Sequence, residues 1–291
     1  MDIGIIDVDS HNYPNLALMK ISAYEKARGN SVEWWNGLKY YDRVYMSKIF
    51  DDTYTEDIRY CINAGEIIKG GTGYGLKDKL PEYIEHIYPD YSLYGITDTA
   101  YGFLTRGCPR HCSFCIVGDK EGLVSRKVAD ISEFYNGQRH IELLDPNILA
   151  CKDRHELLEQ VASTGATVNF NQGLDIRFLD EATAKQLNSI KTERLHFAWD
   201  KYNEHLEKVF ERARGWLDKS PKNTYVYVLT NYDTMTSQDL YRIYKLRDIG
   251  YNPYVMVYDK PNAPAITKKL QRWCNNKFVF ESCKDFNYYK G

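Results

Sequence analysis

The 291-residue sequence contains no run of about 18 consecutive apolar residues, so no helix is expected to cross a membrane. An excess of either charge is also absent. The 38 Lys and Arg balance 40 Asp and Glu, which argues against a dedicated nucleic-acid-binding domain but leaves a local basic groove open. The start, MDIGIIDVDSHNYP, lacks the basic and apolar stretches of a signal peptide. We therefore expect a cytoplasmic protein without a membrane partner.

Cysteine is scarce, with seven residues, and in a reducing compartment these thiols are not expected to form a disulfide framework. Apolar side chains are abundant by comparison: 43% of the residues are hydrophobic and 14% are aromatic, which is enough to form a buried core. The 25 tyrosines are spread along the chain. We expect most of them at the edge of the core, with some able to stack on a base if the substrate is a nucleic acid.

The first part of the chain alternates short apolar runs with a helical pattern. Apolar residues at helical spacing predict a helix within residues 14–30, and Gly29 and Asn30 are typical of a helix end. Strands are predicted at 3–8, 31–35, 42–47 and 65–71. This order predicts a small N-terminal Rossmann-like domain with a parallel sheet, residues 1–98. Residues 80–100, broken by Pro and Gly, are expected to link it to a second domain.

The second part of the chain repeats a strand-helix pattern. Strands are predicted at 100–107, 140–145, 167–173, 194–200, 224–231 and 252–259. Helices are predicted at 128–135, 151–164, 180–190, 203–217 and 237–250. About six such units, joined by right-handed crossovers, predict a partial (β/α)6 TIM-type barrel over residues 99–262, with a C-terminal helix and extension over 263–291. The predicted fold class is α/β, with the active site at the carboxyl ends of the barrel strands.

Three of the seven cysteines lie close together in the stretch RGCPRHCSFC, which follows the first barrel strand. Cys108, Cys112 and Cys115 have the spacing C-x3-C-x2-C. Three thiolates leave one iron of a cubic iron-sulfur cluster without a protein ligand, and a substrate can bind at that open position. A zinc site is the alternative, and it would need a fourth ligand such as His111 or Cys151. The sequence assigns no role to the scattered cysteines Cys61, Cys151, Cys274 and Cys283.

The stretch TRGCPRHCSFC resembles the signature of the radical S-adenosylmethionine (SAM) enzymes, including the aromatic Phe114 before the last cysteine. Its lead-in is similar to the branch that contains cobalamin-type enzymes and methylthiotransferases. The resemblance implies that Cys108, Cys112 and Cys115 bind three irons of a 4Fe-4S cluster. It also implies that SAM binds the fourth iron, with Phe114 beside the adenine. SAM would then be cleaved to methionine and a 5'-deoxyadenosyl radical, with electrons from a low-potential donor such as flavodoxin or ferredoxin.

Polar side chains at other strand ends are candidates for further contacts with SAM or the substrate. Asp145 and Asn147 follow the second barrel strand, although an ordinary Asp-Pro-Asn turn explains them equally well. Arg177 suits a carboxylate because its guanidinium donates two hydrogen bonds. Gln172 and Asp175 suit the ribose hydroxyls, with the capping of a loop as the alternative. The remaining candidates, of which the last two are expected near the adenine, are Asn169, Asn171, Asp200, Thr230 and Asn231.

The N-terminal domain is similar to the cobalamin-binding domain that precedes the barrel in many radical SAM enzymes. Asp9, His11 and Pro14 give D-x-H-x-x-P, where the cobalamin pattern ends in glycine, and the glycine pair Gly70-Gly71 follows later. The proline fixes φ and lacks an N–H where the backbone would pass close to the corrin. The domain is also short for a corrin site. We therefore expect cobalamin to be absent, with the loop after Asp9 and the segment Gly70–Gly75 facing the substrate.

The sequence thus predicts a two-domain radical SAM enzyme whose reaction begins with hydrogen abstraction from a nucleic-acid base or a small metabolite. A cobalamin-dependent radical SAM methyltransferase and a methylthiotransferase are the alternatives within the enzyme class. The chain has no second set of three clustered cysteines for the auxiliary cluster of a methylthiotransferase. The alternative from another class is a non-catalytic metal-cluster scaffold or sensor, which would release neither methionine nor 5'-deoxyadenosine.

Overall fold

The computed structural model describes residues 1–11, 13–58 and 62–291 and divides into two compact units, Met1–Ile141 and Glu142–Gly291. The first unit contains the cysteine loop, so this division differs from the predicted border at residue 98. The predicted domains stay a prediction, because compactness alone does not show which segments fold independently. Cys61 lies outside the described residues. None of the described helices has the length and apolar composition that crossing a membrane requires.

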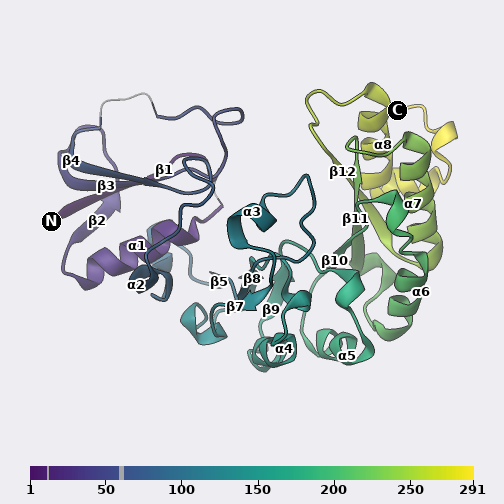
Figure 1. The fold of residues 1–291 in the computed structure, drawn as a ribbon, viewed down its shortest axis with the longest axis horizontal. Coiled ribbons are helices and arrows are strands. Elements are labelled where there is room, and N and C mark those ends of the chain that lie inside the picture. Colours follow the sequence, from purple (N-terminus) through teal and green to yellow (C-terminus); the bar gives the residue numbers. More distant parts are fainter. Residues whose placement is uncertain (12, 59–61) are drawn as a thin grey trace. The chain divides into compact units, whose positions relative to one another are not determined.

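A four-stranded sheet forms the beginning of the first unit (Figure 1). Its strands, in the order β2-β1-β3-β4, are β1 (Asp2–Asp7), β2 (Ser31–Trp34), β3 (Tyr41–Ser47) and β4 (Ala64–Gly70). All neighbouring strands run parallel, and Ile5 of β1 lies beside Tyr45 of β3. The four strands and the parallel sheet predicted for this part of the chain are therefore confirmed.

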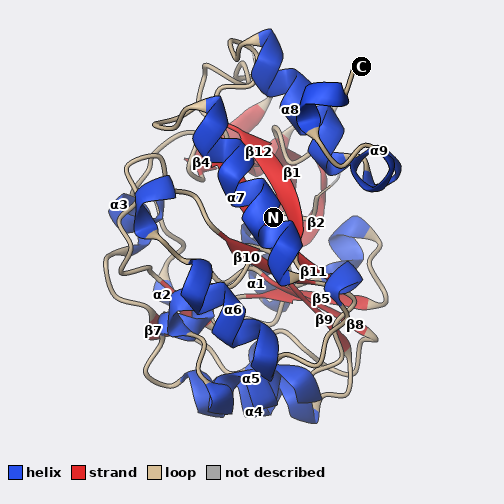
Figure 2. Cartoon of the chain, turned by 90° about the vertical axis from the view of Figure 1, so that its right-hand side faces the viewer, coloured by secondary structure: helices blue, strands red, loops and turns tan. Residues whose placement is uncertain are grey.

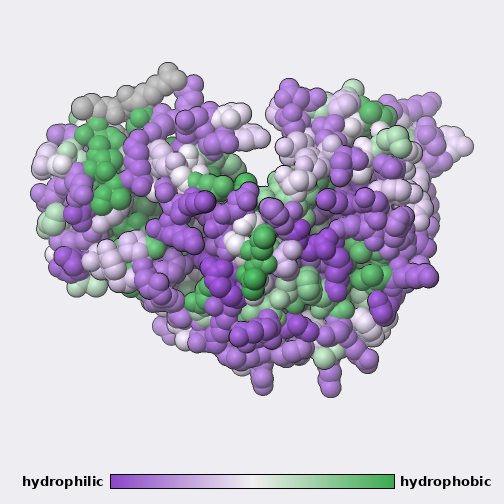
Figure 3. Space-filling view, in the orientation of Figure 1, coloured by the Kyte–Doolittle hydropathy of each residue, from purple (hydrophilic) through white to green (hydrophobic). Residues whose placement is uncertain are grey.

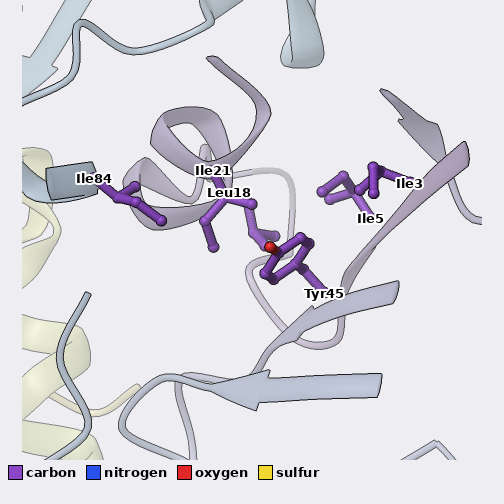
Figure 4. Packing of buried hydrophobic residues seen from close by; sticks show 6 residues of the cluster. All are labelled: Ile3, Ile5, Leu18, Ile21, Tyr45 and Ile84. Carbon is purple, nitrogen blue, oxygen red and sulfur yellow. The ribbon is translucent and has the colours of Figure 1, made fainter. Parts of the chain in front are cut away.

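Helix α1 (Leu16–Ala27) packs on one face of this sheet. Asn15 caps its first turn, because the side-chain oxygen accepts a hydrogen bond from the N–H of Leu18 at 3.2 Å. Gly29 follows its last turn at φ 80°, a conformation that costs glycine little. Side chains from β1, β3, α1 and the short helix α2 (Glu82–Glu85) form a buried cluster of Ile3, Ile5, Leu18, Ile21, Tyr45 and Ile84 (Figure 4).

Strand β4 is the open edge of the N-terminal sheet. In the described part of the chain it pairs with β3 alone, and it exposes Ile67 and Ile68. Figure 3 shows hydrophobic side chains gathered on the surface of this region, at the left. The face of the sheet opposite α1 buries Ile6, Val44 and Met46 under the loops that follow the strands.

The predicted linker, residues 80–100, is folded rather than extended. It contains α2 and a 3-10 helix, Tyr91–Tyr94. The next elements are β5 (Thr99–Gly102), β6 (Thr105–Arg106), α3 (Val117–Glu121) and β7 (Arg126–Lys127). Strands β6 and β7 form an antiparallel pair, so the single strand predicted at 100–107 is two short strands.

The helix predicted at 128–135 is wrong, because this segment forms only a 3-10 turn, Ile131–Glu133. A capping box begins the turn at Asp130. Phe134 then leaves the helical region at φ −140°, and its carbonyl oxygen accepts a hydrogen bond from the hydroxyl of Tyr91 at 2.7 Å. This tertiary contact replaces the intrahelical bond that a longer helix would make.

The second unit continues the alternation of strands and helices. Its strands are β8 (His140–Leu143), which crosses the border between the units, β9 (Thr167–Phe170), β10 (Leu195–Ala198), β11 (Thr224–Thr230) and β12 (Asn252–Val257). Its helices are α4 (Arg154–Ser163), α5 (Glu181–Ser189), α6 (Glu207–Trp216), α7 (Thr236–Ile249), α8 (Ala265–Asn275) and α9 (Lys277–Ser282). The strands and the helices α4 to α7 match predicted elements in position, and α8 matches the predicted C-terminal helix. Helix α9 was not predicted, since it lies in the stretch expected to be an extension.

The strands form two three-stranded sheets, in the orders β5-β8-β9 and β10-β11-β12. A single parallel bridge between Leu174 and Phe197 joins the segment after β9 to β10. Helix α7 packs against β11 and β12, and α8 packs against β12, so one face of this sheet is covered (Figure 2). The α/β class with parallel sheets is confirmed, whereas closure into a partial TIM-type barrel stays a prediction.

Candidate functional site

The cysteine loop connects β6 to α3 within the first unit. Gly107 begins the loop at φ 91°, and a Cβ atom there would overlap the carbonyl oxygen of Val124. The N–H of Cys108 donates to the carbonyl oxygen of Gly122 at 3.0 Å. The loop therefore turns back against the segment before β7, and only glycine fits at the point of closest approach.

The three cysteines of this loop form no disulfide and are half-buried. The N–H of Cys115 donates to the carbonyl oxygen of Cys112 at 2.9 Å, which closes a tight turn between them. Among the described residues, no three His, Cys, Asp or Glu side chains are grouped as in a formed metal site. Ligation of a cluster by Cys108, Cys112 and Cys115 therefore stays a prediction. The chemistry of the donor set fits it, because one short loop offers three reduced thiols.

The two side chains considered as a fourth zinc ligand have different surroundings. His111 is exposed at φ 41°, with Nε2 3.8 Å from Oδ1 of Asp119. Cys151 is fully buried, with Sγ 4.0 Å from Oδ2 of Asp153. The histidine is accessible to a metal ion, whereas the thiol of Cys151 would first have to leave the core.

Helix α3, which follows the last cysteine, is fixed to the rest of the first unit by charged side chains. Arg106 lies before the loop and forms ion pairs with Glu121 of α3 at 2.9 Å and Glu85 of α2 at 3.0 Å. Nζ of Lys120 donates to the hydroxyl of Thr72 at 2.8 Å. Thr72 belongs to the predicted substrate-facing segment Gly70–Gly75, so the first unit brings this segment to the end of the cysteine loop.

The loops at the carboxyl edge of the N-terminal sheet are bound to one another. Asp9 is buried, and its two carboxylate oxygens accept hydrogen bonds from the N–H groups of Ile49 and Phe50 at 2.7 and 2.8 Å. A Cβ atom at Gly73 would overlap the carbonyl oxygen of Phe50. His11 is exposed in the left-handed region, at φ 47°. The carboxylate of Asp9 thus stabilises the loop after β3.

Three of the predicted SAM-contacting residues meet in the second unit. Nδ2 of Asn147 donates to Oδ2 of Asp175 at 3.3 Å, and Arg177 forms an ion pair with Oδ1 of Asp175 at 2.7 Å. Arg177 also forms an ion pair with Glu204 at 2.8 Å. Asp175 caps the 3-10 helix Ile176–Phe178, so the capping alternative holds as well. Glu204 was not among the residues predicted from the sequence. Its position in the loop after β10, at the same edge as the other two loops, is the signal that could have indicated it.

Asp200 lies close to this charged group. Burial raises the pKa of Asp200 to about 6, opposed by the positive charges of Arg242 and Arg177 and reinforced by Glu204 and Asp175. A carboxyl group in this environment changes protonation near neutral pH. Such a shift at the carboxyl end of a strand is typical of functional sites as well as of structural charge networks.

Arg242 of α7 holds the backbone next to Asp200. Its fully buried guanidinium donates to the carbonyl oxygens of Trp199, Asp200 and Leu229 at 2.6, 2.7 and 2.8 Å. It also forms a buried ion pair with Asp239 at 2.6 Å. This arginine fixes the ends of β10 and β11 relative to α7.

The other residues predicted to contact SAM differ in their burial and in their hydrogen-bond partners. Gln172 is exposed, while Asp145 is buried. Thr230 is buried and donates to the carbonyl oxygen of Met256 at 3.3 Å, and Asn231 donates to that of Tyr258 at 2.8 Å. The last two contacts give both side chains a structural role without a ligand. Phe114 is half-buried in the first unit, and Asn169 donates to Glu142 at 2.7 Å.

No protein-family model and no curated protein matches the sequence. Two solved structures of TsrM, a radical SAM methyltransferase from Kitasatospora setae, match the fold with a TM-score of 0.62 at 10% sequence identity. One holds cobalamin and a 4Fe-4S cluster, and the other holds a tryptophan substrate and the SAM analogue aza-SAM. The match covers 88% of this chain and 74% and 72% of theirs.

At this identity the likeness concerns the fold. The cobalamin in one neighbour gives no support to the expectation that this chain lacks it. The chain therefore resembles the radical SAM enzymes in its fold as well as in the spacing of its cysteines.

Proposed function

We propose that the chain is a radical SAM enzyme. Cys108, Cys112 and Cys115 would hold a 4Fe-4S cluster, and bound SAM would supply the 5'-deoxyadenosyl radical that abstracts hydrogen from the substrate. The observation that carries the proposal is the loop of three cysteines spaced C-x3-C-x2-C, in a chain whose fold resembles that of a radical SAM methyltransferase.

The chain's own polar residues are proposed to bind and orient SAM. Arg177 is the candidate for the SAM carboxylate, because a guanidinium can donate two hydrogen bonds to one carboxylate and this one already pairs with the carboxylates of Asp175 and Glu204. Asn147 and Asp175 lie within the same hydrogen-bonded group. The remaining candidates, for the amino group, the ribose and the adenine, are Asp145, Gln172, Phe114, Thr230 and Asn231.

Asp200, at the carboxyl end of β10, is proposed to accept or donate a proton. It holds a proton on a carboxyl oxygen below pH about 6 and loses it above, because burial destabilises the carboxylate. The proposal includes a partial barrel for the second part of the chain and a flavodoxin- or ferredoxin-like electron donor. The cytoplasm, where thiols stay reduced, is the proposed compartment.

The experiment is anaerobic reconstitution of the full chain with iron and sulfide. We expect about four irons and four sulfides per chain, and a change in the electron paramagnetic resonance spectrum of the reduced protein when SAM is added. Methionine and 5'-deoxyadenosine should then be released. Cys108→Ala, Cys112→Ala and Cys115→Ala should abolish that release, whereas Cys274→Ala, at a buried cysteine outside the loop, should keep it. One tightly bound zinc ion without sulfide would contradict the proposal.

A second candidate function is cobalamin-dependent methyl transfer, which the cobalamin of the solved neighbour favours. It is distinguished by its products, since methyl transfer from SAM releases S-adenosylhomocysteine. A methylthiotransferase would need an auxiliary cluster, for which the sequence has no second group of three cysteines. A cluster scaffold or sensor would reconstitute but leave SAM intact.

A further inference from the structure

The sheet β10-β11-β12 has one face that α7 and α8 do not cover. Side chains alternate along a strand, so Val226 and Val228 lie under the helices while Tyr227 lies on the other face. The register places Tyr227 beside Tyr254 of β12. His196 of β10 lies on the same face as Tyr227, because its ring contacts that of Tyr227. We call His196, Tyr227 and Tyr254 the aromatic face.

The rings of the aromatic face lie in contact with each other. His196 and Tyr227 are stacked, with ring centroids 5.3 Å apart and planes 4° apart. Tyr254 meets Tyr227 edge-on, with centroids 5.9 Å apart and planes 77° apart. Tyr254 is 37% exposed, and its neighbour Met256 is 45% exposed. Two stacked rings and one edge-on ring thus adjoin on a face of the sheet that is accessible at Tyr254 and Met256.

The polar atoms of these rings have no hydrogen-bond partner among the described residues. Across residues 1–11, 13–58 and 62–291, the ring nitrogens of His196 and the hydroxyls of Tyr227 and Tyr254 make no hydrogen bond. On the helix-covered side, by contrast, Tyr251 donates to the carbonyl oxygen of Phe210 at 3.1 Å. Aromatic side chains of this kind usually satisfy their polar ends when they serve only as core.

The aromatic face is also electrically neutral. Burial lowers the pKa of His196, helped by the charge of Arg194, and burial raises the pKa of Tyr227. Both rings are therefore uncharged near neutral pH, and the imidazole offers one donor and one acceptor. Arg194 and Lys277 lie over the neighbouring ring of Tyr225, on the same side of β11, at 5.5 and 4.9 Å from its ring centroid.

We propose that His196, Tyr227 and Tyr254 bind a planar heteroaromatic ring of the substrate. Stacking on the rings and hydrogen bonds to their open polar ends both favour a flat ring with polar edges. An aliphatic ligand would leave those polar ends without partners, at a cost in free energy. The inference rests on the proposed function, because it names the substrate class of the same enzyme.

The test uses the full chain, with and without reconstituted cluster, and indole as the probe. Binding is titrated by saturation-transfer NMR, with cyclohexanol as a non-planar control. We expect indole to bind and cyclohexanol not to bind. Tyr227→Leu and Tyr254→Leu should each weaken indole binding about tenfold or more. Tyr254→Phe, which keeps the ring, should retain most of it, and this variant guards against a loss caused by misfolding.

The matched control is Tyr241→Leu. Tyr241 of α7 is 42% exposed, close to the exposure of Tyr254, but its hydroxyl donates to Glu207. This variant should bind indole like the wild type. Unchanged binding in both Tyr227→Leu and Tyr254→Leu would overturn the inference, as would equal binding of cyclohexanol. Displacement of indole by SAM would also overturn it, since the face would then hold the adenine of SAM.

SAM cleavage tests the proposed function independently of indole binding. Release of methionine and 5'-deoxyadenosine is measured on the same samples. A wild type that binds indole but does not cleave SAM would contradict the proposed function, and the aromatic face would then be a ring-binding site without a role in that reaction. A wild type that cleaves SAM but binds indole regardless of Tyr227 and Tyr254 would contradict only the aromatic face.

Discussion

Gly107 and Gly29 both adopt positive φ, but only Gly107 lies against another segment of the chain. Alanine at either position costs about 1 kcal/mol of backbone strain. At Gly107 its Cβ atom would also push against the carbonyl of Val124 and distort the cysteine loop. We expect Gly107→Ala to lose most of its reconstituted iron, measured per chain, and Gly29→Ala to keep it. Equal iron content in the two variants would show that the loop tolerates the shift.

Arg177 is the second residue whose role can be tested by itself. Arg177→Ala should weaken SAM binding about tenfold while the cluster still assembles, and Lys should restore binding only in part, since it cannot make a two-pronged contact. The control is Arg154→Ala, which removes another partly buried ion pair, with Asp180 at 3.1 Å. Calorimetric titration with SAM measures the difference. Equal SAM affinity in wild type and Arg177→Ala would assign this arginine to the structural pairing of Asp175 and Glu204.

Asp200 gives a prediction about stability and pH. Its pKa of about 6 in the folded chain lies above that of an unfolded aspartate, so the folded state binds the proton more tightly. As pH rises from about 4 to about 6, the unfolded state ionises first, and the wild type loses stability. We expect Asp200→Asn to be more stable by roughly 2 to 3 kcal/mol at pH 7 and about equal to the wild type near pH 3, measured by urea unfolding. A gain that does not depend on pH would contradict the raised pKa.

The sequence predicted single residues well where one rule decided their position. Asn147, Asp175 and Arg177 were expected together because loops after parallel strands meet at one edge of a sheet. The partner Glu204 was not found, since a contact between two loops depends on their conformations. The aromatic face was also missed as a site. The alternation of Tyr and Val in TYVYV indicates a strand with two different faces, but not which face the helices cover.

At the scale of elements, α7 depends on a buried charge. Arg242 and Asp239 form an ion pair inside the protein, while Lys245 and Glu211 form one at its surface, at 3.0 Å. Arg242→Met would leave the carboxylate of Asp239 and several carbonyl groups without their donor, at a cost of about 3 to 5 kcal/mol. Lys245→Met should change stability by less than about 1 kcal/mol. Chemical unfolding of both variants measures this, and a similar small loss in each would contradict the role given to Arg242.

The elements themselves were largely predictable, because apolar residues recur with periods of about 3.6 or 2 along most of them. The exception at 128–135 shows the limit of that signal. There the bond from Tyr91 to the carbonyl of Phe134, made between segments far apart in the sequence, overrides the local pattern. The short strands β6 and β7 were not separable either, since each has two residues and no period.

At the scale of the whole molecule, cobalamin binding distinguishes the two candidate functions. The fold neighbour holds it, whereas in this chain Asp9 binds the loop after β3 and Gly73 lies against the backbone of Phe50, at the carboxyl edge of the N-terminal sheet. We expect the purified chain, mixed with hydroxocobalamin and desalted, to retain no corrin absorbance. A stoichiometric corrin spectrum would reverse this expectation and favour methyl transfer. His11→Ala would then show whether the exposed histidine is involved.

The open edge of the N-terminal sheet has a practical consequence for handling the protein. Among residues 1–11, 13–58 and 62–291, no strand pairs with the outer side of β4, which also exposes Ile67 and Ile68. Such an edge is the usual template for the addition of strands from other molecules. Glu66 and Lys69, also exposed on this strand, discourage the addition of such strands by their charges. High salt screens these charges, so concentrated samples should remain free of aggregates longest in a buffer of low ionic strength.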